Sequence, residues 1–144
     1  MAVLALMIVL LPVMSQAGTW KKNSTGWWWQ EDNGSWPANQ WKYIHGTWYA
    51  FDGNGYMRTG WYWDGRFWYY LTGSGAMVEG WAYIGGSWYY MVPGNGAMVG
   101  AGWHLIDNSW YYMNGSGAMC SNRWIGNSVS YTHLRAHETL SDLV

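Results

Sequence analysis

The sequence predicts an all-β fold, a solenoid of stacked β-hairpins, and three observations support this prediction. A tryptophan returns about every twenty residues along most of the chain, and a fixed period in this range is typical of repeat arrays. In each unit two short aromatic runs flank a tight-turn dipeptide, which is the pattern of a hairpin. Between residues 20 and 126 the apolar residues do not follow a helical period. The core is therefore expected to run along the repeats.

The composition favours a neutral, aromatic surface. The 144 residues include 15 Trp and 12 Tyr, only 10% are charged, and the net charge is −1. Because Lys21-Lys22 is the only basic cluster, electrostatic attraction to nucleic acid or to an anionic membrane is excluded as the main interaction. Cys120 stands where other units have an apolar residue, and we interpret it as a core filler.

Residues 1–17 are predicted to be a signal peptide, which implies a secreted protein with no stable membrane span. The apolar run from Ala2 to Val13 is too short to cross a bilayer. Ser15 and Ala17 then supply small residues for cleavage before Gly18. The run lacks a preceding Lys or Arg, so a wrongly assigned start codon and an uncleaved anchor are the alternatives.

The repeat array is predicted to cover residues 18–126. Tryptophans seven residues apart mark its units, with Trp124 opening a further one: Trp29/Trp36, Trp41/Trp48, Trp61/Trp68, Trp81/Trp88 and Trp103/Trp110. Four dipeptides are predicted to close two-residue hairpins, since they tolerate a positive φ: His45-Gly46, Asp64-Gly65, Gly85-Gly86 and Asp107-Asn108. A glycine-containing loop with a methionine then leads to the next unit.

The hairpin register decides where the indoles point. A turn at His45-Gly46 places Tyr43 opposite Trp48 and Trp41 opposite Ala50. Cross-strand partners share one face of a sheet, so Trp41 and Trp48 are expected side by side. An isolated hairpin is only marginally stable in water. Neighbouring hairpins should therefore stack, with the loop methionines filling the junctions and the next unit's tryptophan approaching the pair.

Aromatic walls without an anionic partner suit a quaternary ammonium group. The negative face of an aromatic ring attracts the cation, and each such contact contributes roughly 0.5–2 kcal/mol. Several weak sites along one rod would together bind a polymer that carries many cations more tightly than any single site, through avidity.

These units resemble choline-binding repeats, the cell-wall-binding repeats of Gram-positive surface proteins and phage lysins. The resemblance covers about residues 20–126 and is carried by segments such as GRFWYYLTGSGAMVEGW and GSWYYMVPGNGAMVGAGW. The leading segment TGWWWQEDNGSWPANQWKYIHGTWY is similar to the opening of the choline-binding domain of pneumococcal-type autolysins, which are amidases. The resemblance implies a left-handed superhelix of hairpins that binds choline, a wall-associated location, and phosphocholine on teichoic acids as the partner.

The resemblance also assigns choline-binding residues by position. The expected sites are Trp41/Trp48/Trp61, Trp61/Trp68/Trp81, Trp81/Trp88/Trp103 and Trp103/Trp110/Trp124. Met77, Met98 and Met119 are expected as fourth walls, and Tyr70, Tyr90 or Tyr112 could substitute for a tryptophan. Tyr49, Tyr69, Tyr89 and Tyr111 are interpreted as structural. Ala50 replaces the second tyrosine of the Trp-Tyr-Tyr element and predicts a poorer site in the first unit.

We expect no enzyme, cofactor or metal site in this chain. The carboxylates are scattered in turns, and no HExxH, GxSxG, CxxC or P-loop motif is present. The predicted function is a non-catalytic wall-binding module, with a C-terminal fragment of a wall-lytic amidase as an alternative. An α-glucan-binding repeat is the other alternative, although such repeats usually have Tyr and Phe where this chain has Trp. A homo-oligomer is a further possibility that the sequence leaves open.

Residues 127–144 are predicted to be a non-repeat tail. VSYTHLRAHETLSDLV lacks tryptophan and glycine and resembles the translation of sequencing-adapter DNA, which indicates an assembly artefact. A genuine short helix is the alternative. His133 and His137 could share its face, but two histidines without a further ligand do not make a metal site.

Overall fold

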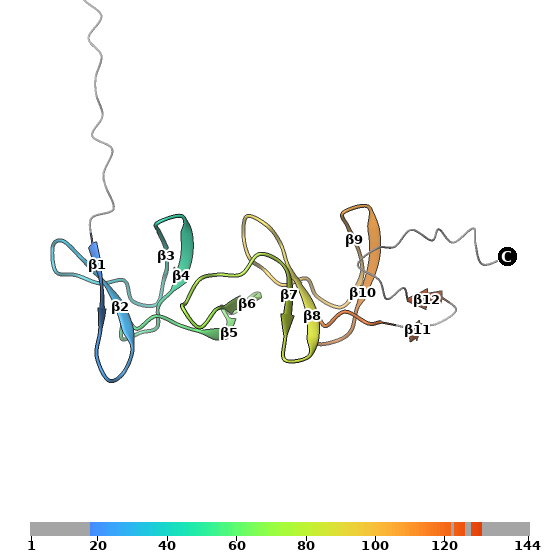
Figure 1. The fold of residues 1–144 in the computed structure, drawn as a ribbon, viewed down its shortest axis with the longest axis horizontal. Helices are drawn as coiled ribbons and strands as arrows, with labels where there is room; N and C mark the ends of the chain where they lie inside the picture. The colour runs from blue at the N-terminus through green and yellow to red at the C-terminus, as the bar shows by residue number, and fades with distance from the viewer. Residues whose placement is uncertain (1–17, 122, 126–127, 131–144) are drawn as a thin grey trace, which may run out of the picture.

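The computed structural model describes residues 18–121, 123–125 and 128–130, and its regular elements are all strands. They form a chain of successive hairpins (Figure 1), which confirms the predicted hairpin solenoid. The strands are β1 Gly18–Lys22, β2 Trp27–Glu31, β3 Trp41–Ile44, β4 Thr47–Ala50, β5 Gly60–Trp63, β6 Trp68–Leu71, β7 Gly80–Ile84, β8 Ser87–Met91, β9 Gly102–Ile106, β10 Ser109–Met113, β11 Arg123–Ile125 and β12 Ser128–Ser130. The predicted signal peptide lies outside the described residues.

The hairpins wind around a common axis without forming a continuous sheet. In the described part of the chain each strand pairs only with its hairpin partner, in two-stranded antiparallel sheets. Figure 1 shows β1–β2 and β7–β8 projecting downward, and β3–β4 and β9–β10 projecting upward. The direction of projection therefore recurs at every third hairpin, as in a superhelix.

Three of the four predicted two-residue turns are confirmed by their backbone angles. His45 and Gly46, Gly85 and Gly86, and Asp107 and Asn108 all have positive φ, as type I′ turns require.

The predicted turn at Asp64-Gly65 is wrong. Trp63 pairs with Trp68, so four residues connect β5 to β6. The Asp64 carboxylate accepts hydrogen bonds from the backbone N–H groups of Arg66 and Phe67, each at 2.8 Å. This side-chain capping stabilises the longer turn, and the Phe67 N–H is the main reason that the pKa of Asp64 is lowered.

The predicted register of the β3–β4 hairpin is confirmed, with Trp41 opposite Ala50 and Tyr43 opposite Trp48. In β5–β6 the longer turn changes the register, so that Trp61 lies opposite Tyr70 and Trp63 opposite Trp68, where a two-residue turn would have placed Trp61 opposite Trp68. Since side chains alternate along a strand, the two indoles seven residues apart share one face in both hairpins.

The interpretation of Trp29 and Trp36 as a hairpin pair is wrong. The first hairpin is β1–β2, and its tryptophans seven residues apart are Trp20 and Trp27. Trp29 is 1% exposed and packs with Ile44 and Phe51, whereas Trp36 follows β2 in a segment without strand structure. The seven-residue spacing therefore holds in the first hairpin for Trp20 and Trp27.

A main-chain hydrogen bond and a glycine contact join consecutive repeats. Each loop methionine donates its backbone N–H to a tryptophan carbonyl of the preceding hairpin: Met57 to Trp27, Met77 to Trp48, Met98 to Trp68 and Met119 to Trp88, at 2.7–2.9 Å. The side chain of each of the first three methionines then lies against a glycine of the next loop: Met57 at Gly75, Met77 at Gly96 and Met98 at Gly117. These glycines have positive φ, so the same position demands both an unusual backbone and the absence of a Cβ.

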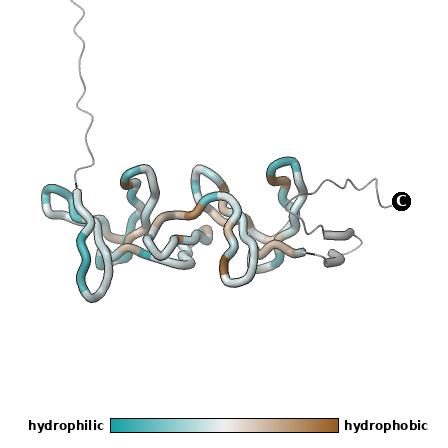
Figure 2. The backbone as a smooth tube through the Cα atoms, in the orientation of Figure 1, coloured by the Kyte–Doolittle hydropathy of each residue, from teal (hydrophilic) through white to brown (hydrophobic). Residues whose placement is uncertain are grey.

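The core is a series of small clusters along the axis. Three hairpins end in a fully buried residue that forms an isolated β-bridge to the loop methionine that follows it: Leu71, Met91 and Met113. Figure 2 shows mostly pale backbone with few strongly hydrophobic segments, because Trp and Tyr score near the middle of this hydropathy scale. The mean hydropathy of −0.23 therefore understates how aromatic this core is.

The paired backbone continues past the predicted end of the array at residue 126. β11 pairs with β12, with Trp124 opposite Val129. Residues 131–144 lie outside the described residues, and the origin of the tail stays a prediction.

Candidate functional site

The repeats bring together a recurring group of four side chains, which we call an aromatic set. Each set contains the two tryptophans of one hairpin that are seven residues apart, a tyrosine from the next hairpin and the methionine of the loop that follows this next hairpin. The four sets are Trp20/Trp27/Tyr49/Met57, Trp41/Trp48/Tyr69/Met77, Trp61/Trp68/Tyr89/Met98 and Trp81/Trp88/Tyr111/Met119.

The same contact recurs in every set. The tyrosine ring meets the first tryptophan edge to face, with ring centroids 4.9, 4.9, 4.8 and 4.7 Å apart along the chain. In the third and fourth sets the two tryptophan rings also contact each other and lie nearly perpendicular. Their ring centroids are 6.3 Å apart for Trp61 and Trp68 and 6.5 Å apart for Trp81 and Trp88. Each set is thus an angled group of rings held by the hairpin register and by the methionine main-chain bond.

Two of the sets line open pockets. A pocket of about 590 Å³ is lined by Trp20, Trp27, Tyr49 and Met57, with Gly73 and Ser74 on its rim. A pocket of about 290 Å³ is lined by Trp41, Trp48, Tyr69 and Met77, with Gly94 and Asn95 in the equivalent positions. Trp27 and Trp48 are 42% and 38% exposed, so large ring surfaces remain accessible in otherwise well-packed units.

The structure groups the predicted site residues differently from the sequence expectation. Met77 and the pair Trp41/Trp48 lie together, but their pocket is lined by Tyr69 and not by Trp61. Trp61 belongs to the following set, where it contacts Trp68 and Tyr89.

The tyrosines expected as substitute walls lie beside the sets and are not among their four recurring side chains. Tyr70, Tyr90 and Tyr112 contact the first tryptophan of their own hairpin, 5.1–5.3 Å between ring centroids. Where Ala50 replaces such a tyrosine, Trp41 instead contacts Tyr62 of the next hairpin at 5.6 Å. Trp103 and Trp110 are 40% and 56% exposed, and the side chain of Trp124 lies outside the described residues.

Sequence reasoning missed the first set and the tyrosine position. The seven-residue spacing of Trp20 and Trp27 could have revealed the first hairpin. The tyrosine that directly follows the second tryptophan, which the sequence suggests is structural, faces away from the pair in its own hairpin. Only the stacking of hairpins turns it toward the preceding pair.

Charged groups differ between the sets. The Lys22 ammonium lies 5.2 Å from the ring centre of Trp27 in the first set. In the second set a neighbouring pocket shares Trp48 and Met77 and includes Glu79, whose carboxylate accepts a hydrogen bond from the Gly94 N–H at 3.1 Å. Burial, together with the nearby Asp64 carboxylate, raises the pKa of Tyr69.

The described residues contain no group of three or more His, Cys, Asp or Glu that could hold a metal ion. In residues 18–121, 123–125 and 128–130 no helix has the length and hydropathy needed to cross a bilayer.

Family models of two related repeats match the array. The choline-binding repeat model matches residues 59–103, and the cell wall binding repeat model matches residues 39–57 and 101–119. Together these segments contain most of the aromatic sets.

Solved and curated proteins show the same similarity. The crystal structure of choline binding protein F from Streptococcus pneumoniae is 42% identical with a TM-score of 0.72, over 78% of this chain and 37% of that one. The pneumococcal cell wall endolysin of phage Cp-1 in complex with choline is 35% identical with a TM-score of 0.57, over 82% and 42%. The lysozyme of Streptococcus phage Cp-1 is 55% identical over 31 residues, which is 22% of this chain and 9% of that protein. The chain therefore spans less than half the length of these relatives.

Proposed function

Because the chain belongs to the choline-binding repeat family, we propose that it attaches to the cell wall by holding choline groups of a wall polymer in its aromatic sets. The observation that carries this proposal is the fourfold recurrence of two tryptophans, one tyrosine and one methionine in the same arrangement. Under this proposal the protein acts outside the cell, bound to phosphocholine-bearing polymers.

The chemistry of the sets suits choline. The ring faces attract a cation, and the methyl groups of a quaternary ammonium need no hydrogen bonds when they are buried against indole and thioether. Two or three cation–π contacts of roughly 0.5–2 kcal/mol each give on the order of −4 kcal/mol, which corresponds to a millimolar site. Several such sites on one rod would bind a polymer far more tightly than one site binds free choline.

The similarity to phage lysozymes favours a related second proposal, in which this repeat region is the wall-binding part of a lytic enzyme. The two proposals share the same sites and differ only in what else the parent protein carries. Lysis of choline-containing walls by the full gene product, but not by residues 18–130 alone, would support the second.

Retention on an immobilised tertiary amine tests the proposed ligand. We expect the protein to bind a diethylaminoethyl resin in high salt and to elute with choline at millimolar concentration, because free choline competes for the sets. High salt screens the attraction between ordinary surface charges and the resin, so retention under this condition indicates binding in the aromatic sets.

The α-glucan alternative predicts a different result in the same experiment. Retention by a dextran column, together with no effect of choline on either column, would contradict the choline proposal.

A further inference from the structure

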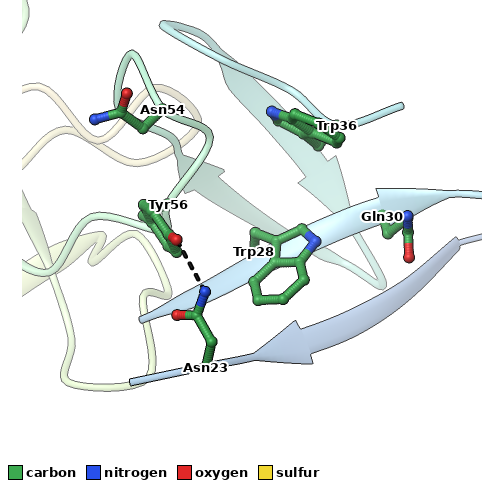
Figure 3. A pocket seen from close by; sticks show the side chains of 6 residues that line it. All are labelled: Asn23, Trp28, Gln30, Trp36, Asn54 and Tyr56. Carbon is green, nitrogen blue, oxygen red and sulfur yellow. Dashed lines mark hydrogen bonds between the residues drawn. The ribbon is translucent and has the colours of Figure 1, made fainter. Parts of the chain in front are cut away.

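We propose that a separate pocket on the first hairpin binds a neutral saccharide that carries acetamido groups. The pocket has a volume of about 240 Å³ and is lined by Asn23, Trp28, Gln30, Trp36, Asn54 and Tyr56. Figure 3 shows Trp28 at its centre, with Tyr56 and Gln30 on either side and Trp36 above it in this view.

This pocket is distinct from the aromatic sets. Trp28 and Gln30 alternate with Trp27 and Trp29 along β2, so they point to the face opposite the Trp20/Trp27 pair. The same strand thus presents one ring to the first aromatic set and another to this pocket. The inference does not depend on choline binding.

The pocket is built from residues that depart from the repeat pattern. Gln30 stands three residues after Trp27, where the other hairpins have the fully buried Phe51, Leu71, Met91 and Met113. Tyr56 directly precedes its loop methionine, where the later loops have Ala76, Ala97 and Ala118. One change from an apolar to a polar side chain and one from a small to an aromatic side chain therefore line the same pocket.

Trp36 is a third departure. It packs against Gly55 in the way that Met57 packs against Gly75, with its ring close to where a Cβ would lie. Yet Trp36 stays 54% exposed. The tryptophan in the methionine's position therefore adds an exposed ring to the edge of the pocket and still fills the junction between consecutive repeats.

The rings provide a corner for the apolar side of a sugar. Trp28 and Tyr56 meet at 87° with their centroids 6.2 Å apart. The C–H face of a pyranose can lie on one ring while an acetamido methyl packs on the other, as apolar walls with a few polar groups allow in ligand pockets.

The polar groups are side-chain amides held in place. Asn23 donates to the Tyr56 hydroxyl at 2.9 Å, and its carbonyl oxygen accepts from the Thr25 and Gly26 N–H groups. Gln30 donates to the Gly34 carbonyl at 3.3 Å. Amides both donate and accept hydrogen bonds, which is what hydroxyl and acetamido groups need, and the lining contains no charged residue to attract an ion.

Titration with chitotetraose, the β-1,4-linked tetramer of N-acetylglucosamine, tests this site with saturating choline present. We expect saturable binding in the millimolar range. Trp28→Ala should weaken this binding at least tenfold, and Gln30→Ala should weaken it several-fold. Gln40→Ala removes an exposed amide outside the pocket and should bind chitotetraose as the wild type does. Choline binding should be unchanged in all three variants, which also verifies that they fold.

Several results would overturn the proposal. They are the absence of saturable chitotetraose binding, unchanged binding in Trp28→Ala, and equal binding of maltotetraose, which lacks acetamido groups. Sedimentation provides a further check. A wild-type dimer that Trp28→Ala dissociates would show that the pocket contacts a second copy of the chain, and this result would also overturn the proposal. Failure of choline binding alone would contradict the proposed function and leave the sugar result to be judged by itself.

Discussion

Replacing Gly117 with alanine is expected to lower the free energy of unfolding by about 1–3 kcal/mol more than the same change at Gly86. A Cβ at Gly117 would lie 2.5 Å from the Met98 Cε and 3.0 Å from the Val99 carbonyl oxygen. The methionine end can swing aside, but the carbonyl belongs to a segment fixed by hydrogen bonds from the Met98 N–H to Trp68 and from the Val99 N–H to Tyr90. The added methyl group must therefore strain the joint between repeats.

Gly86 is a matched control for this change. Its φ is +87°, close to the +77° of Gly117, but nothing lies within 4 Å of its hypothetical Cβ. Both variants share the cost of a side chain in the left-handed region, so their difference isolates the contact. Denaturant unfolding measures it. Equal loss of stability in the two variants would contradict the account of the joint.

Replacing Trp68 with alanine is expected to weaken one choline site and leave the others unchanged. Trp68 supplies one wall of the Trp61/Trp68/Tyr89/Met98 set. The loss of one cation–π contact, roughly 0.5–2 kcal/mol, weakens that site by about 2- to 30-fold. Equilibrium dialysis with choline just sufficient to fill the wild-type sites should therefore show a loss of a fraction of one bound ligand per chain, approaching one at the upper end of this range.

Trp63 provides the control in the same hairpin. It lies directly opposite Trp68 and is 47% exposed against 43%, but it is not a member of an aromatic set. Trp63→Ala should keep the number of bound cholines. If both variants bind less choline, or neither does, the assignment of the set is wrong.

The hairpins could be predicted because each is specified locally. The dipeptides His45-Gly46 and Gly85-Gly86 fix the turn and hence the register, and strand alternation then places both indoles on one face. The exception, Asp64, shows the limit of a dipeptide rule, since its carboxylate caps a longer turn that the Asp-Gly pair does not reveal.

The composition of the sets could not be predicted from one hairpin. Tyr69 and Tyr89 face away from the tryptophans of their own units, and only the packing of consecutive hairpins brings them 4.9 Å from Trp41 and 4.8 Å from Trp61. That packing depends on contacts about thirty residues apart, such as the Met98 N–H to the Trp68 carbonyl. The sequence period indicates such contacts but does not specify their angle.

A comparison of choline with 3,3-dimethylbutan-1-ol tests most directly whether the aromatic sets bind a cation. The two molecules have nearly the same shape, but the alcohol has a carbon in place of the positively charged nitrogen. If ring faces attract the charge, choline should change the tryptophan fluorescence saturably at millimolar concentration, and the neutral analogue should need at least about ten times more. Equal responses to the two molecules, or no saturable response to choline, would contradict the account.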